Sequence, residues 1–160
     1  MTSNYTPDEL VKIAGAVMVS GMAVAMVDMG IINTAIEAGA MAKEIAGAAK
    51  TYPNNSIIQA LFSEEAIKQA QSEHPQRLEI KADEMQPDTA VDTAIAKINE
   101  ALAVLSQKAT PEEIAEYKEF IYSCADKVAN AAGSGLFGTG PKVSEKEAAA
   151  LTKLKATLGL

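Results

Sequence analysis

The stretch IAGAVMVSGMAVAMV, residues 13–27, decides the fold class of this chain. It holds 15 consecutive uncharged residues, and it is rich in Gly, Ala and Ser rather than Leu. Spanning a bilayer takes about 20 apolar residues, so this run is shorter than a membrane helix requires. Its length suits a helix buried at the centre of a bundle, which predicts no membrane insertion; a membrane anchor is the alternative interpretation.

Capping signals show where this central helix and a later one begin. TPDEL at residues 6–10 and TPEEI at residues 110–114 share one pattern. In each, Thr is a good N-cap, Pro suits the first helical position, and the Glu three residues after Thr completes a capping box. We expect the first helix to run from this cap to about Asp28.

The rest of the chain is also predicted to be helical. Capping residues predict helices that start near Asn33 or Thr34, after Asn55, after Ser63 and after Ser144. Apolar residues recur at helical steps of three and four in three places: Val91, Ile95, Ile98, Leu102 and Leu105; Ile114, Tyr117, Ile121, Cys124 and Val128; and Leu151, Leu154 and Leu158. Residues 74–86 are the least regular stretch. Within them Leu78 and Ile80 alternate with charged residues as in a strand. A lone strand would have no partner for its backbone groups, so we expect an extended loop. The prediction is an all-α bundle of six to seven helices in a single domain, residues 1–160.

Charge limits the partners of this chain. The formal net charge is −7 and the pI is about 4.8. Nucleic acids and anionic membrane surfaces would repel such a protein, because both attract Lys and Arg. We therefore expect no nucleic-acid binding, and the partners that this charge favours are cations or basic proteins.

The residues that carry most catalytic chemistry are scarce. The chain has one histidine, His74, and one cysteine, Cys124. Neither a catalytic triad nor a His-based metal site can be assembled from them, so we expect a protein that is not an enzyme. A single cysteine cannot form an intramolecular disulfide, which favours a reducing cytoplasm. Cys124 falls on an apolar stripe and is predicted to be an inert core residue.

Methionine and alanine are the other marked features of composition. The chain has 30 alanines, and small side chains let helices approach closely. Five of the seven methionines cluster early in the chain: Met18, Met22, Met26, Met29 and Met41. We expect them to fill core space between alanine-rich helices, although methionine surfaces also serve adaptable binding.

The two ends of the chain are similar to each other. The two TP motifs lie 104 residues apart, and 22 residues after each Thr come Asp28 and Ala132, each followed closely by glycine. An apolar residue and a second capping box then follow, at Thr34…Glu37 and at Ser144…Glu147. This pattern predicts two related helical hairpins, 6–52 and 108–160, joined by middle helices in 53–107. The alternative is that capping rules alone produce the similarity.

With these two similar ends, the sequence resembles the TerB-like family, which consists of small helical proteins named for tellurite resistance. The matching segments are VAMVDMGI at residues 24–31 with Glu37, and VANAAG at 128–133 followed by VSEKE at 143–147 and Leu158-Gly159. The resemblance spans nearly the whole chain. It implies a cytoplasmic, stress-associated binding protein whose acidic residues near both loops bind metal. Met29 is an extra residue in the first loop and Ala132 stands where the family has an acid, so only Asp28, Glu37 and Glu147 carry over.

Oxygen ligands of this kind suit a hard cation such as Ca²⁺ or Mg²⁺, and no other cofactor is expected. Asp28, Asn33 and Glu37 would surround one loop. The alternative is that these residues only cap a helix. A second functional hypothesis is a structural or interaction module with no small ligand, either a partner-protein scaffold or a homodimer that buries its first helix.

Overall fold

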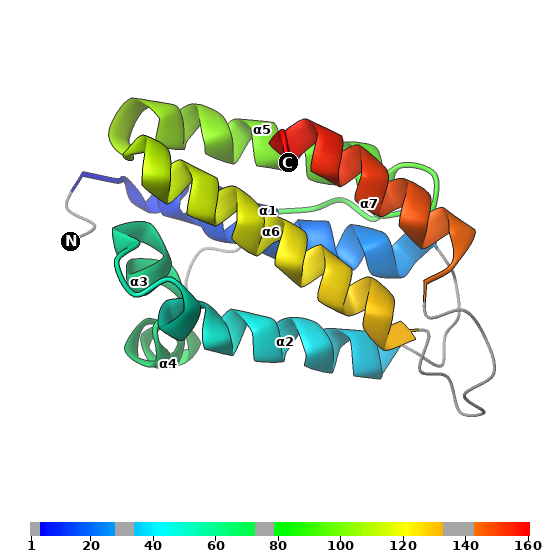
Figure 1. Ribbon diagram of the computed structural model, residues 1–160, viewed down its shortest axis with the longest axis horizontal. Helices are drawn as coiled ribbons and strands as arrows, with labels where there is room; N and C mark the ends of the chain where they lie inside the picture. The colour runs from blue at the N-terminus through cyan, green and yellow to red at the C-terminus, as the bar shows by residue number, and fades with distance from the viewer. Residues whose placement is uncertain (1–3, 28–33, 73–78, 133–142) are drawn as a thin grey trace.

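The computed structural model describes residues 4–27, 34–72, 79–132 and 143–160 (Figure 1). Within these ranges the chain forms seven α-helices and no strand. The helices are α1 (Pro7–Val27), α2 (Thr34–Thr51), α3 (Ser56–Phe62), α4 (Glu64–Ser72), α5 (Ala90–Lys108), α6 (Pro111–Ala132) and α7 (Glu145–Leu158). The predicted all-α bundle is confirmed, and the part of 74–86 that the structure describes forms no strand.

Helices α1 and α6 form the centre of the bundle. α1 packs most extensively against α5 and α6, and α2 packs along α6 (Figure 1). α7 contacts α1, α5 and α6 together, while the short helices α3 and α4 follow α2 at one end. Buried apolar residues from every helix except α4 form the core.

The composition of α1 explains its central position. Ten of its residues are buried, among them Ile13, Val17 and Val24, and three are glycine or serine. By length and composition alone α1 could also cross a membrane, but 56% of its apolar window is buried inside the bundle. Such burial is typical of a core helix, because the helix has packing partners on most of its circumference.

Gly21 allows α1, α2 and α6 to meet closely. A β-carbon at this position would overlap the Sδ atom of Met41 in α2, and it would lie 3.4 Å from Cγ2 of Val128 in α6. The contact with Val128 is an ordinary van der Waals distance, so the Met41 side chain is the neighbour that a larger residue at position 21 would displace. Glycine at this position therefore leaves room for the buried Met41 side chain.

The predicted capping boxes form where their side chains are described. Glu9, Glu113 and Glu147 accept hydrogen bonds from the backbone N–H groups of Thr6, Thr110 and Ser144 at 2.7, 2.9 and 2.8 Å. The hydroxyl of each capping residue accepts from the backbone of its glutamate in return. α2 begins at Thr34 as predicted, but the side chains of Asn33 and Thr34 lie outside the described residues.

The prediction that the methionines fill the core is wrong for two of them. Met41 is buried and Met26 is partly buried, whereas Met18 and Met22 are 42% and 40% exposed. Met29 lies outside the described residues. Because α1 is apolar on nearly every side, its sequence has no polar stripe to show which side faces out.

Candidate functional site

The three acidic residues predicted to hold a cation lie in different parts of the structure. Glu37 is in the first turn of α2 and is 5% exposed, and Glu147 is in the first turn of α7 and is 3% exposed. Both helices begin at the same end of the bundle, and they lie on either side of α6 in Figure 1. Asp28 lies outside the described residues.

Among the residues that the structure describes, no group of three or more His, Cys, Asp or Glu side chains could hold a metal ion. Glu147 takes part in the capping box of α7, so one of its carboxylate oxygens already has a structural partner in the Ser144 N–H group. The described residues thus provide one buried carboxylate in α2 and one in α7, not a shared cluster.

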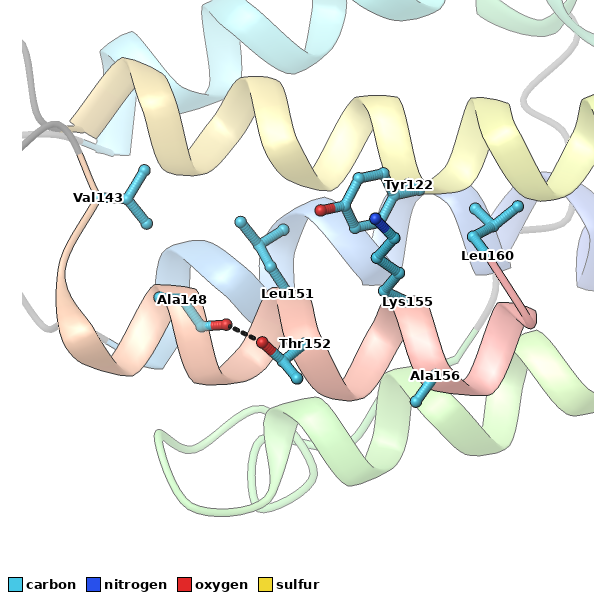
Figure 2. Close-up of a pocket in the computed structure, with 8 residues that line it drawn as sticks. All are labelled: Tyr122, Val143, Ala148, Leu151, Thr152, Lys155, Ala156 and Leu160. Atoms are coloured by element: carbon cyan, nitrogen blue, oxygen red, sulfur yellow. Dashed lines mark hydrogen bonds between the residues drawn. The ribbon is translucent and has the colours of Figure 1, made fainter.

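An open groove runs between α6 and α7 (Figure 2). Its volume is about 430 Å³, and its wall on α7 is formed by Ala148, Leu151, Thr152, Lys155 and Ala156. The Lys155 ammonium lies 5.5 Å from the ring centroid of Tyr122, a cation–π contact across the groove. The described lining contains no carboxylate side chain, imidazole or thiol, so it offers contact area but little acid–base chemistry.

A second groove, of about 410 Å³, lies on the other flank of α7, against the start of α5. Asp88 and Asp92 line it on one side, and Lys146 and Lys153 line it on the other. The Lys153–Asp92 pair is 4.0 Å apart and largely exposed, so it contributes little to stability. Neither groove contains Glu37 or Glu147.

No family model, curated protein or solved structure matches this chain. The TerB-like organisation therefore rests on the residues alone and stays a proposal.

The buried reactive groups are held in unreactive forms. Burial raises the pKa of the Cys124 thiol, and the negative charge of Glu44 raises it further. Burial also raises the pKa of the Tyr117 phenol, whose hydroxyl donates a 2.6 Å hydrogen bond to the carbonyl oxygen of Ile13. A thiol or phenol that stays protonated is a poor nucleophile, so both side chains serve packing. The core position predicted for Cys124 is confirmed.

A buried polar contact that the sequence does not predict joins α3 to α6. Asn55 is fully buried, and its side-chain oxygen accepts from the Ile58 N–H group at 3.0 Å as the N-cap of α3. Its NH₂ group donates to the backbone carbonyl of Glu113 and to the carboxylate of Glu116, both at 3.0 Å. Ser56 donates to the Glu113 carboxylate through both its backbone and its hydroxyl. The cap of α3 is thus also the attachment of α3 to α6.

Two glutamates at helix starts make the fold sensitive to acid. A hydrogen bond from Lys108 holds the pKa of Glu9 below its ordinary value, assisted by the Thr6 backbone. Burial alone would raise the pKa of Glu113, but hydrogen bonds from Ser56 and Thr110 together lower it. The folded state therefore binds these protons less tightly than the unfolded chain does, and stability depends on pH.

We expect the free energy of unfolding to be nearly constant from neutral pH to about pH 5.5 and to fall below it. Carboxylates with a lowered folded pKa stabilise the protein fully above their ordinary pKa of 4.5, and this contribution is lost as pH falls through the folded values. Urea unfolding at several pH values measures the slope. A Glu9→Gln, Glu113→Gln variant should be less stable at neutral pH and show a shallower acid slope. An unchanged slope would assign the acid sensitivity to other carboxylates.

Proposed function

We propose that this chain is a non-catalytic cytoplasmic binding protein of TerB-like organisation that takes a divalent cation where the second helix of each hairpin begins. The proposed role is in the response to a toxic oxyanion or a related stress, as the resemblance implies. The observation that carries the cation proposal is a buried carboxylate in the first turn of both α2 and α7.

Packing between the two hairpins supports the duplication. Tyr117 donates to the carbonyl of Ile13, and Lys108 donates to the carbonyl of Asn4; in both pairs the residues are 104 apart, the offset of the repeat. The second helix of each hairpin also packs against the first helix of the other, α2 on α6 and α7 on α1. Contacts between equivalent positions are expected when two related units pack around a pseudo-two-fold axis.

The burial of the two glutamates supports a charged ligand. Glutamate is rarely buried unless its charge is compensated, because removing a carboxylate from water is costly. Glu37 and Glu147 are nearly inaccessible, whereas Glu145, in the same helical turn as Glu147, is exposed. Both carboxylates also have interactions within the chain, the capping box of Glu147 among them. A bound Ca²⁺ or Mg²⁺ would add a positive charge that prefers carboxylate oxygens as ligands.

Thermal unfolding of metal-stripped protein, with and without added Ca²⁺, Mg²⁺, Mn²⁺ or Zn²⁺, tests the proposal. A cation at 100 times its dissociation constant should stabilise the folded protein by about 2.7 kcal/mol. Glu37→Gln and Glu147→Gln should each reduce the shift, because glutamine keeps the hydrogen-bonding shape and loses the charge. Glu145→Gln is the matched control and should respond like the parent. A flat response of the parent to all four metals would end the proposal.

A second candidate is an interaction module with no small ligand. It is favoured by the exposure of Met18 and Met22 on an otherwise buried helix.

A further inference from the structure

Two methionines of α1 are exposed on the same side of the helix. Met18 and Met22 are 42% and 40% exposed, whereas Met41 and Met85 are each 9% exposed. Residues four positions apart lie on one face of a helix, with their β-carbons about 5–6 Å apart. The side chains of Met18 and Met22 therefore share one accessible surface, which we call the outer methionine pair.

The outer methionine pair differs in reactivity from the other oxidisable groups of the protein. A thioether is oxidised without losing a proton first, whereas a thiol reacts as its thiolate. Cys124 is buried and burial raises the pKa of its thiol, so little thiolate forms there. The chain has no tryptophan. Among the residues that the structure describes, Met18 and Met22 thus present the most accessible oxidisable sulfur.

Hydroperoxides are the class of oxidant that this chemistry takes. The sulfur lone pair attacks one peroxide oxygen, so that an S–O bond forms while the O–O bond breaks. The leaving oxygen takes up a proton and departs as water or an alcohol, and the two electrons lost by sulfur reduce the peroxide. A methionine sulfoxide reductase reverses the change with two thiols, which become a disulfide while the sulfoxide oxygen leaves as water.

The position of a methionine decides whether the fold tolerates its sulfoxide. At Met18 and Met22 the new polar group adjoins solvent, so it does not have to be buried without a partner. At Met41 the Sδ atom packs so closely against α1 that a β-carbon at Gly21 would overlap it. An added oxygen on that sulfur would be both buried and crowded. Oxidation of the outer methionine pair therefore leaves the core packing unchanged, whereas oxidation of Met41 disrupts it.

We propose that the outer methionine pair is a reversible oxidation site, which consumes hydroperoxides at the protein surface while the fold stays intact. This site goes beyond the proposed function, because it uses neither Glu37 nor Glu147 and needs no cation. Each cycle of oxidation and reduction removes one hydroperoxide per methionine. The oxidised state also changes the exposed side of α1 from apolar to polar.

Mass spectrometry of the folded protein after brief treatment with dilute hydrogen peroxide measures the oxidation of each methionine. Trypsin cuts after Lys12 and Lys43 and at no residue between them, so Met18, Met22 and Met41 lie in one peptide. Fragment ions then assign every added oxygen. Met18 and Met22 should each be oxidised about 10-fold faster than Met41 or more, because Met41 becomes accessible only when the structure opens.

Unfolded protein in urea is the control for intrinsic reactivity. There the three methionines should react at similar rates, since each is the same thioether in an open chain. The folded protein that carries both sulfoxides should keep its circular dichroism spectrum, and its melting temperature should shift by no more than about 3 °C. Incubation with sulfoxide reductases for both epimers and a thiol should restore the original mass.

Two variants test whether the pair accounts for peroxide consumption. With reductases and thiol present, Met18→Leu with Met22→Leu should consume hydrogen peroxide at about half the parent's rate or less. Met41→Leu, which removes a buried thioether instead, should consume it as fast as the parent. Circular dichroism confirms that both variants are folded.

Three results would overturn the proposal: native Met41 oxidised as fast as Met18, loss of the folded state when only the outer pair is oxidised, or sulfoxides at the pair that the reductases leave unchanged. Stabilisation by metal ions is measured on unoxidised protein, so failure of one proposal leaves the other standing.

Discussion

Replacing Gly21 with valine is expected to lower the free energy of unfolding by about 3 kcal/mol, in the upper part of the range for overpacked cores. A β-carbon alone overlaps the Sδ atom of Met41 and touches the side chain of Val128. The two γ-methyl groups of valine need further space in a junction of three helices. Either α2 must move away from α1 or Met41 must leave its buried position, and both changes lose packing. Denaturant titration followed by circular dichroism measures the loss.

The glycines of α2 provide the matched control. A β-carbon at Gly39 or Gly47 would have no other atom within 4 Å. Alanine at either position should therefore stabilise the protein by about 0.5–1 kcal/mol, because glycine in a helix interior is unfavourable. Met41→Ala should also recover part of the stability lost in Gly21→Val, which a double-mutant cycle detects. If valine at 21 and valine at 39 are equally tolerated, the close contact of α1 with Met41 is wrong.

Replacing Asn55 with alanine is expected to destabilise the protein by about 3 kcal/mol. The Ile58 N–H group would lose its cap, which costs about 1 kcal/mol. The carbonyl of Glu113 and the carboxylate of Glu116 would each lose a donor at a part-buried contact. A polar group left without its partner costs about 1–3 kcal/mol when it is buried. Urea unfolding measures the change.

Two variants separate the capping role of Asn55 from its attachment to α6. Ser63→Ala removes the hydroxyl that accepts a hydrogen bond from the Ala66 N–H group at the start of α4. This cap joins residues only three positions apart, and its loss should cost about 1 kcal/mol or less. Asn55→Ser retains a capping oxygen but removes the NH₂ group, and should be intermediate. If Asn55→Ala is no more harmful than Ser63→Ala, the bonds to Glu113 and Glu116 contribute nothing.

The local and the distant hydrogen bonds of Asn55 differ in whether the sequence predicts them. The start of α3 was predictable because capping depends on residues three positions apart. The attachment to α6 joins residues 58 and 61 positions apart, and no local pattern contains that information. The same limit applies to Gly21, whose neighbours Met41 and Val128 come from two other helices.

The candidate site was predictable only in part. The capping box identified Glu147 as a residue of the first turn of α7, but its near-complete burial depends on how α7 packs against the bundle. The outward position of Met18 and Met22 could not be predicted either, because a helix that is apolar on all sides gives no periodic signal. Which methionines face the core is decided by the helices that surround α1.

The central position of α1 has a consequence during synthesis. Its packing partners α5, α6 and α7 lie between Ala90 and Leu158, so they leave the ribosome long after α1 does. At the usual 5–20 residues per second this interval is on the order of ten seconds. For that time the most apolar helix of the chain has few of its native neighbours, and nascent chains with exposed apolar segments are the usual clients of chaperones. Contacts between residues so distant in sequence also slow folding, because a long loop must close before they form.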